Sequence, residues 1–404
     1  MGERARHLRR RGRCPWTGRR HPPDQEPCMS RGTRPRTFDP LRRAVAAVTA
    51  ATLALAGAVV LVTGPQAAPS FAAVGQCPDP GQFPGIGNLP PVFTDNNVAV
   101  YAGGNFLATG SASEAEGVLV VGGDATFNRT LSGSSFNVGT VGAGSQIAPD
   151  PGTVMLHVGG TLDVVAPTNV IVGAGYSGQG GGDVQVGAAK TGAGTVDMNG
   201  GELRPGLGAE NALAPFGDFG DQVSQASTAF AGLTGTPVAV AGNSATFDGS
   251  TSSALHVFTV DAAVLNGVNE LNFNGFTDGA PIVINVVGGP VDFQPNYFAA
   301  NNVRFDDFAS PDFGNWASRI MWNFVDADAV QLGPAGASQF MGSVMAPTAD
   351  VQLYNHMNGR VYVGGDLTFG ARDRRAGWRS TTTRGSGRGR STASRPRASS
   401  CRRR

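Results

Sequence analysis

The chain has 404 residues, of which 59 are Gly and only 15% are charged. That much Gly beside 41% hydrophobic residues is typical of a β-rich protein with many turns, and it disfavours a helical one. The charge is segregated: residues 1–43 hold 13 Arg and residues 371–404 hold 12, whereas residues 44–370 hold six cationic and 25 acidic side chains. A body with a formal charge of −19 lacks the cationic face that nucleic-acid binding needs.

Residues 1–73 are interpreted as an N-terminal extension followed by a secretory signal peptide. Arg42 and Arg43 precede an uncharged apolar run at 44–62, and a small-x-small cleavage site follows at 70–72. Together these three features are typical of an export signal. The run of 19 residues is also just long enough to span a bilayer, so a retained membrane anchor is the alternative. Cys77 is the only Cys between residues 74 and 370, so no disulfide can form within the body.

Residues 74–91 are a Pro/Gly-rich lead-in, and a repeated phrase begins after it. The phrase is an apolar run, Gly-Gly, one further residue and another apolar residue; it occurs at Val100–Phe106, Leu119–Ala125, His157–Leu162, Asn285–Val291 and Tyr362–Leu367, with a weaker copy at Val196–Leu203. The first Gly of the pair falls at Gly103, Gly122, Gly159 and Gly200, with gaps of 19, 37 and 41 residues. At about 20 residues per coil these gaps predict one, two and two coils of a β-solenoid. Such coils must stack to bury their apolar faces.

Short β segments alternate with turns from residue 96 to about residue 369 and include Gly117–Phe127, Val154–Val165, Val184–Val186, Leu255–Val260, Ile282–Val287 and Ala349–Leu353. One stretch, 215–233, breaks this rhythm. Its apolar residues recur at spacings of 4, 3, 4 and 3, at Phe219, Val223, Ala226, Phe230 and Leu233. This spacing predicts one amphipathic helix lying along the coils. The segment Phe308–Trp316 is a second possible cap.

Residues 371–404 consist mainly of Arg, Ser, Thr and Gly and cannot form a packed core. They are expected to be disordered. The favoured interpretation is that they arise from a shifted reading frame; the alternative is a basic arm that binds anionic polymers.

Several phrases in fixed order resemble the choice-of-anchor A family of bacterial surface proteins. They are Glu116–Ala125, Ile320–Ala327, a segment at Phe340–Val351 similar to the family's G-S-I-L-A-P-x-A-x-V, and a closing strand at Gly359–Leu367. The resemblance covers residues 92–370 and implies a secreted, adhesive domain whose C-terminus carries one of several anchors. It implies no catalytic residues. A sorting motif and an apolar span would be expected after Phe369, and the sequence has neither there.

Few residues have the spacing expected of a catalytic or metal-binding site. His157, His256 and His356 have no partner at metal-ligand spacing. Asp124 and Asp366 directly follow a Gly-Gly pair and Asp163 lies three residues after one, so that in a stack they would form an acidic ladder for Ca²⁺. The favoured interpretation of all three is turn formation through hydrogen bonds to backbone N–H groups.

Two further groups of residues have two interpretations each. The paired carboxylates Glu114 and Glu116 would be needed by a glycoside hydrolase, but they share one face of a strand without an obvious cleft. The alternation around Trp322 predicts that its ring is in the core, whereas Tyr354 and His356 follow a strand and are expected to be exposed.

The sequence therefore predicts a mainly β protein whose residues 92–370 form a single β-solenoid with one helix packed alongside. Its predicted function is a non-catalytic, adhesin-like module, secreted or on a bacterial cell surface, that needs no cofactor. The expected partner is an extracellular polymer, a glycan or an environmental surface; nucleic acid is not expected, and a membrane would be reached only through an uncleaved signal or a missing C-terminal anchor. An ice-binding protein is the first alternative, which ordered Thr-x-Thr rows would favour, and a polysaccharide-active enzyme is the second.

Overall fold

The computed structural model describes residues 82–87, 91–129, 134–142, 144–277, 279–333, 339–354 and 356–370. Within these ranges the protein is mainly β, with 32 strands and four α-helices. The expected signal peptide and the Arg-rich tail lie outside the described residues. None of the described helices has the length and apolar character needed to cross a membrane.

Two large parallel sheets contain most of the strands. The first, here called the covered sheet, has eleven strands in the spatial order β15 (Leu203–Arg204), β12 (Asp183–Val186), β9 (Val154–Val158), β5 (Val118–Val121), β2 (Val98–Ala102), β31 (Val361–Val363), β28 (Ser343–Ala346), β25 (Ile320–Phe324), β21 (Ile282–Val287), β19 (His256–Asp261) and β16 (Thr236–Pro237). The second, the open sheet, has eight: β13 (Lys190–Thr191), β10 (Leu162–Val164), β6 (Ala125–Asn128), β3 (Phe106–Thr109), β32 (Leu367–Phe369), β29 (Asp350–Leu353), β26 (Ala329–Leu332) and β22 (Val291–Phe293).

Two smaller sheets form the third side. The short sheet has the order β14 (Thr195–Asp197), β11 (Asn169–Val172), β7 (Ser135–Gly139) and β4 (Glu114–Glu116). The lower sheet has the order β17 (Ala239–Ala241), β18 (Ser244–Asp248), β20 (Glu270–Asn274), β23 (Tyr297–Ala300) and β24 (Val303–Arg304). Two further pairs lie outside these sheets: β1 (Phe93–Thr94) with β8 (Ile147–Ala148), and β27 (Phe340–Met341) with β30 (Met357–Asn358). The helices are α1 (Ala209–Ala212), the 3₁₀ turn η1 (Ala214–Phe216), α2 (Phe219–Ala231), α3 (Ala262–Leu265) and α4 (Phe313–Arg319).

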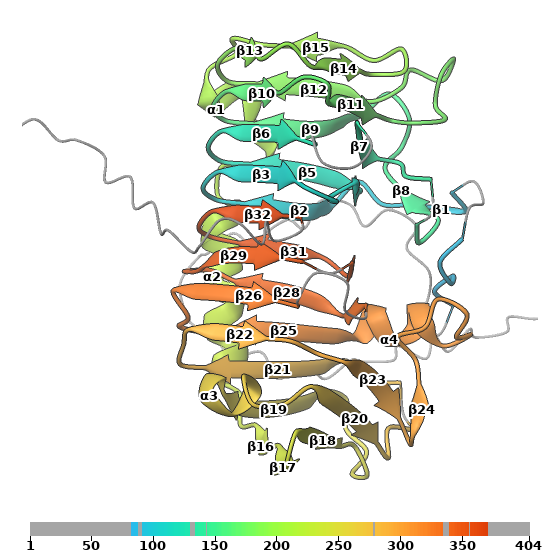
Figure 1. Ribbon diagram of the computed structural model, residues 1–404, viewed down its shortest axis with the longest axis vertical. Coiled ribbons are helices and arrows are strands. Elements are labelled where there is room, and N and C mark those ends of the chain that lie inside the picture. The colour runs from blue at the N-terminus through green and yellow to red at the C-terminus, as the bar shows by residue number, and fades with distance from the viewer. Residues whose placement is uncertain are drawn as a thin grey trace, which may run out of the picture. The chain divides into compact units, whose positions relative to one another are not determined.

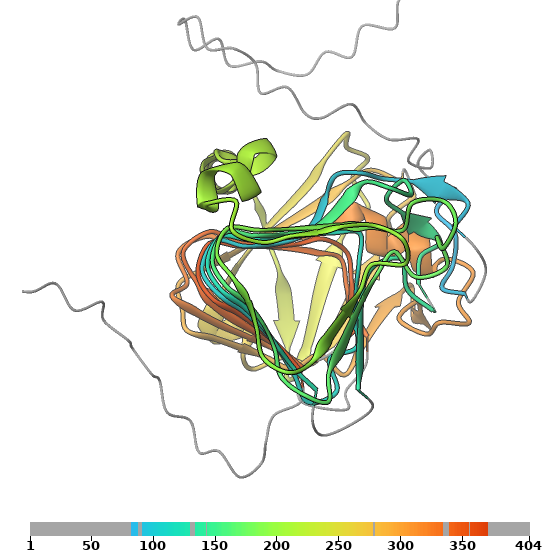
Figure 2. The same cartoon turned by 90° about the horizontal axis from the view of Figure 1, so that it is seen from above.

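The chain visits the three sides in turn and returns to the covered sheet beside the strand that it left. From β2 it passes through β3 and β4 to β5, where Leu119 pairs in parallel with Val100. Figure 2 shows the three sides as a triangle in cross-section. Alternate residues of each strand point inward, as in β3, where Phe106 and Ala108 are buried and their neighbours are not. Because side chains of a strand alternate between its two faces, every second residue contributes to one core that the three sides share.

The strands are not stacked in chain order. β2 to β15 run toward one end of the covered sheet, the chain returns along the outside through α1, η1 and α2, and β16 starts again at the other end (Figure 1). The later strands then lead back until β31 lies beside β2, with Tyr101 opposite Tyr362, and β32 lies beside β3, with Leu107 opposite Thr368. We call these two strand pairs the join.

The Gly-Gly phrase marks the corner between the covered and open sheets. A Cβ added to Gly122 would lie 2.2 Å from the carbonyl oxygen of Gly103, and one added to Gly159 would lie 2.2 Å from that of Gly122. Across the join, a Cβ on Gly103 would lie 2.4 Å from the oxygen of Gly364. The repeat therefore exists because backbones of successive strands meet at this corner too closely for any side chain.

The coil count predicted from the Gly-Gly gaps is wrong in two places. Leu119 pairs directly with Leu156, so the 37-residue gap is one coil with a long third side and not two coils. Gly200 does not belong to the corner column, because Gly187 is the residue that meets Gly159. The number of residues in a coil varies because the loops between its strands differ in length, and a longer loop does not change the strand register.

The predicted helix is confirmed as α2, which lies along the outer face of the covered sheet (Figures 1 and 2). It begins at Phe219, four residues later than predicted, because residues 214–216 form a 3₁₀ turn. Val223 is buried in its packed face as expected. Leu233 lies beyond the last helical residue and is 39% exposed, so its assignment to that face is wrong. The cap expected at 308–316 overlaps α4, which begins at Phe313 and ends at Arg319; Phe308 lies before the helix and is 45% exposed.

Trp322 is buried as predicted, among a cluster of Phe rings that includes Phe247, Phe293 and Phe340. Its indole N–H donates to the carbonyl of Met341 at 3.0 Å, which satisfies the one polar atom of the ring.

We expect Gly122→Ala to destabilise the protein by about 3 kcal/mol, because the new methyl group would overlap backbone atoms that cannot move independently. Gly217→Ala is the control, since a Cβ at Gly217 meets nothing within 4 Å and its φ is −60°. Denaturant unfolding of both variants measures the effect. Equal midpoints for the two would contradict the close approach at the corner.

Candidate functional site

The outer face of the covered sheet is occupied by the helical segment. The Nδ1 atom of His157 lies 2.8 Å from the carbonyl of Ala212, and the amide of Asn285 donates to the carbonyl of Phe230 at 2.8 Å. Between these points, the hydroxyl of Ser227 donates to the side-chain oxygen of Asn323 at 2.6 Å. Burial lowers the pKa of His157, so its ring is neutral beneath the helix. This face is fastened to the helix and is not available to a ligand.

The outer face of the open sheet is not covered in this way. Among the described helices, α3 packs against the edge strand β22, and the outward side chains of the other strands are at least partly exposed. Strand pairing places one outward side chain of each strand in register across the whole sheet. This central row is Thr191, Asp163, Thr126, Leu107, Thr368, Gln352, Gln331 and Asp292. Its members repeat at about 4.8 Å, the spacing of neighbouring strands.

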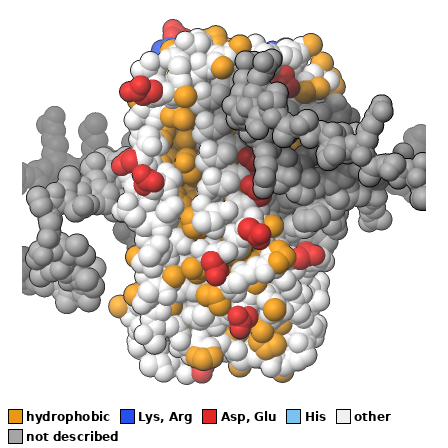
Figure 3. All heavy atoms as spheres, turned by 90° about the vertical axis from the view of Figure 1, so that its left-hand side faces the viewer, with side chains coloured by type: hydrophobic (Ala, Val, Ile, Leu, Met, Phe, Trp, Pro, Cys, Tyr) orange, Lys and Arg blue, Asp and Glu red, His pale blue; other side chains and the backbone are white. Residues whose placement is uncertain are grey.

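The charge of the central row changes along its length. The five inner positions, from Thr126 to Gln331, carry no charge, and Asp163 and Asp292 flank them. Lys190, at the edge strand, donates to the carbonyls of Gly192 and Gly194 at 2.9 and 2.6 Å, so its ammonium is held at the turn. The side of the molecule in Figure 3 shows acidic and hydrophobic side chains among uncharged ones, with Lys and Arg only at its upper edge.

A second line of side chains follows the Gly-Gly corner beside the central row. We call it the corner column: Asp124, Asn105, Asp366 and Asp350. Each accepts a hydrogen bond from the backbone N–H of the next strand: Thr161 to Asp124 at 2.6 Å, Asp124 to Asn105 at 2.9 Å, Asn105 to Asp366 at 2.7 Å and Asp366 to Asp350 at 2.8 Å. The column therefore satisfies turn donors along the corner and continues across the join.

The three candidate calcium residues are not brought together. Asp124 and Asp366 are both in the corner column, separated by Asn105, whereas Asp163 lies in the central row and accepts the hydroxyl of Thr191 at 2.9 Å. Within the described part of the chain, no group of three or more His, Cys, Asp or Glu side chains could hold a metal ion. The three residues do not form one ladder, because Asp163 is two positions farther along its strand than a column member; the favoured interpretation is turn formation through backbone N–H groups.

The paired carboxylates Glu114 and Glu116 lie on β4 in the short sheet. The N–H of Ser145 donates to Oε2 of Glu116 at 2.8 Å, so this carboxylate fastens the segment that follows residue 143. Burial raises the pKa of Glu116, and the Ser145 hydrogen bond opposes that effect. Burial also raises the pKa of Glu114, against the attraction of the Arg129 guanidinium. Glu116 thus fits a role in holding this segment, whereas Glu114 interacts with Arg129.

The two residues that were predicted to be exposed, Tyr354 and His356, differ in their exposure. His356 is exposed as expected and lies 6.3 Å from the ring of Phe308. Tyr354 is half-buried, and its hydroxyl donates to Gln352 of the central row. Sequence reasoning missed the central row and half of the corner column, because register between strands up to 260 residues apart has no local signal.

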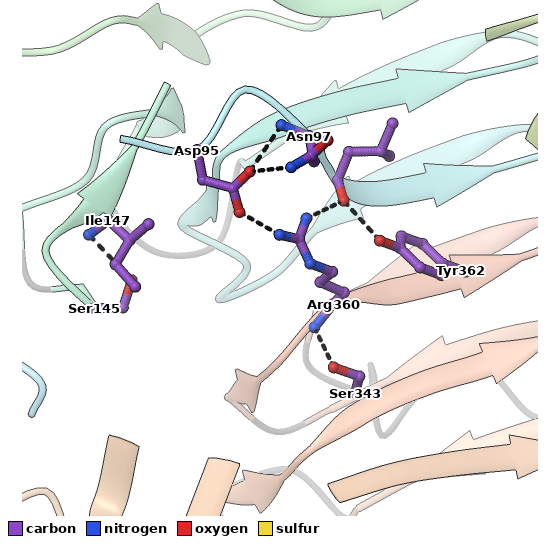
Figure 4. A network of polar contacts seen from close by, with 8 residues as sticks. Asp95, Asn97, Ser145, Ile147, Ser343, Arg360 and Tyr362 are labelled. Carbon is purple, nitrogen blue, oxygen red and sulfur yellow. Dashed lines mark hydrogen bonds and ion pairs between the residues drawn. The ribbon is translucent and has the colours of Figure 1, made fainter. Parts of the chain in front are cut away.

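The join is held by side chains as well as strands, on the side of the covered sheet (Figure 4). Arg360 forms an ion pair with Asp95 and also donates to the carbonyl of Val98. The hydroxyl of Tyr362 donates to the same carbonyl at 2.9 Å, and burial raises the pKa of Tyr362 so that it keeps its proton. Residues near the start of the described chain are thereby tied to residues near its end.

The family described as "Putative Ice-binding-like adhesive domain" matches residues 93–365. No curated protein matches the chain. Among solved structures, the ice-binding protein from the Antarctic ascomycete Antarctomyces psychrotrophicus is similar, with 19% sequence identity and a TM-score of 0.30. That match covers 55% of this chain and 92% of the other.

We expect Arg360→Ala to lower the free energy of unfolding by about 2 kcal/mol, because Asp95 and the Val98 carbonyl would lose charged hydrogen bonds in a partly buried site. Arg204→Ala removes ion pairs with Glu202 and, at 3.4 Å, with Asp183. Because the Arg204 side chain is 46% exposed, its loss should leave the unfolding midpoint nearly unchanged. Urea unfolding of both variants makes the comparison. A midpoint for Arg360→Ala equal to the parent's would mean that the ion pair does not hold the join.

Glu116 should make stability depend on pH. Its folded-state pKa is above the unfolded value of about 4.3, so the folded protein binds the proton more tightly and its stability falls as pH rises through the folded-state pKa. Glu116→Gln should flatten this fall while keeping an acceptor for Ser145. Glu210→Gln, at an exposed position, should retain it. Melting temperatures across acidic to neutral pH test this, and an unchanged profile in Glu116→Gln would contradict it.

Proposed function

Because the chain belongs to the family of ice-binding-like adhesive domains, we propose that it is a non-catalytic binding module that attaches to an extracellular surface through the open sheet. The observation that carries the proposal is the uncovered central row, which runs in register across eight strands. A wide sheet face with side chains at one repeat matches a ligand that is itself extended and regular. The partner class is an extracellular polymer, a glycan or an environmental surface.

The proposed ligand is neutral at the centre of the contact. The inner positions of the central row offer hydroxyl and amide groups around Leu107, which can exchange hydrogen bonds with uncharged polar groups while one apolar side chain is covered. Asp163 and Asp292, with the corner column beside them, disfavour an anionic polymer by like-charge repulsion.

We extend the proposal to the whole body: residues 92–370, the range of the choice-of-anchor A resemblance, act as a single β-solenoid with α2 packed alongside. What supports this is the repeated passage through three sides with parallel pairing between successive coils. Export and display at a bacterial cell surface belong to the same proposal and rest on the sequence features before residue 73.

Ice is the second candidate ligand, because the even spacing of the central row also suits a crystalline surface and Thr126 and Thr368 flank Leu107 in it. The criterion of Thr-x-Thr rows is not met on the described strands of the open sheet, where Thr126 is followed two residues later by Asn128. Ice-crystal shaping by the protein separates this candidate from a polymer ligand. The polysaccharide-active enzyme has less support, since Glu116 is engaged by Ser145.

The test is binding of the full chain to an array of glycans and extracellular-matrix proteins, repeated with Leu107→Glu. We expect this variant to lose at least about tenfold in affinity for whichever ligand the parent binds, because a carboxylate would be desolvated in the contact without a partner. Ile171→Glu is the matched control: it places the same charge on the outer face of the short sheet, where Ile171 pairs with Asn137 and Asp197. Equal loss in both variants, or none in Leu107→Glu, would show that the open sheet is not the binding face.

A further inference from the structure

A polar pocket lies at the β16 end of the stack, away from the central row. Its volume is about 300 Å³. Its lining combines hydroxyl-bearing residues, two other polar residues and three apolar ones: Thr234, Thr236, Thr251 and Ser253, then Asp248 and His256, then Leu255, Val257 and Phe258. We call it the end pocket. Three segments meet there: the chain entering β16, the loop after β18, and the first residues of β19.

The walls of the end pocket are fixed by ordinary strand pairing. Thr236 pairs in parallel with Phe258, and the backbone N–H of His256 donates to the carbonyl of Pro281 at 2.9 Å. The His256 ring is 6% exposed and packs edge-on against Phe276, with ring centroids 4.8 Å apart. The wall formed by β16 and β19 is thus set by the sheet.

Asp248 supplies a charged acceptor at the rim. Its Oδ1 accepts the N–H of Ser250 at 2.9 Å, and this hydrogen bond lowers the pKa of the carboxyl, which is therefore ionised in neutral solution. The carboxylate of Asp248 is exposed and lies beside the Thr and Ser residues of the lining.

The lining chemistry excludes most ligand classes. An anion would meet Asp248 with no Lys or Arg in the lining to balance it. A calcium ion would need six to eight oxygen ligands at short distance, and the pocket offers one carboxylate. A purely apolar ligand would cover the Asp248 carboxylate and the Thr residues of the lining without forming hydrogen bonds to them. A polyhydroxyl compound satisfies these groups, because its hydroxyls both donate and accept, as do those of Thr and Ser.

We propose that the end pocket binds one neutral sugar residue, as a free monosaccharide or as the terminal unit of a glycan. The volume is at the lower limit of about 300–1,000 Å³ for small-molecule sites, which suits one ring and not an oligosaccharide. Thr236, on an ordered strand, and Asp248, at the rim, are the residues that select for hydroxyl groups. This site goes beyond the proposed surface attachment and does not depend on it.

The experiment is a titration of the full chain with neutral monosaccharides (glucose, galactose, mannose, xylose and N-acetylglucosamine), followed by saturation-transfer difference NMR and calorimetry. At least one sugar should bind with a dissociation constant in the millimolar range. Thr236→Val keeps the shape of the side chain and removes its hydroxyl, and should weaken binding about tenfold by leaving a sugar hydroxyl unpaired. Asp248→Ala should weaken it similarly, and it tests the other wall, because Asp248 is the last residue of β18 in the lower sheet.

Thr246→Val is the matched control, because Thr246 lies on β18 opposite Ala239 and Asn272 and outside the lining. It should bind sugar as the parent does, and so should Leu107→Glu, whose effect is confined to the open sheet. Melting temperatures verify that each variant is folded. The proposal is overturned if no sugar in the panel binds, or if Thr236→Val and Asp248→Ala, both folded, bind as tightly as the parent.

Discussion

The pairing of β2 with β31 and of β3 with β32 is the constraint on which the rest of the structure depends. A solenoid built in chain order needs only neighbouring coils to pair, and its stability is a sum of local terms. Here the strands of the first coil, β2 and β3, lie in the interior of the two large sheets. One edge of each pairs with the coil that follows, and the other edge pairs only with the last strands of the chain, β31 and β32. The Asp95–Arg360 ion pair and the Asn105–Asp366 hydrogen bond close that gap over more than 260 residues of sequence. Loss of the join would expose strand edges on both halves at once.

Local features of this architecture were predictable from the sequence, and their global arrangement was not. The Gly-Gly phrase revealed that the coils repeat, because only Gly fits where the backbones of successive strands approach closely. The helix at 219–231 followed from its apolar spacing, but its partner face did not, since Ser227 and Asn323 make the central polar contact between helix and sheet. Coil counting failed at Leu119–Leu156 because turns vary in length without changing register. Asp163 was grouped with Asp124 because both follow a Gly pair. Their different distances from that pair place them in different rows of the sheet, which only the strand register reveals.

The two ends of the stack limit association between copies. Both edges of the covered sheet are short strands, and each carries a Pro, Pro237 within β16 and Pro205 directly after β15. Pro removes a donor from the edge ladder and so weakens strand addition. At the β16 end of the stack, the lower sheet ends in the antiparallel pair of β17 with β18, which replaces the parallel register that a further coil would need. These devices favour separate molecules over end-to-end fibres.

The central row crosses the join at its middle, where Leu107 and Thr368 lie opposite each other. These two residues belong to strands that enter the fold first and last. A ligand that covers the inner positions therefore contacts both halves of the stack together, and its binding energy adds to the stability of the join only while the join is formed. A ligand confined to either end contacts one half and adds nothing to the join. The placement of the first coil at the centre thus gives the proposed surface attachment and the closure of the fold the same physical location.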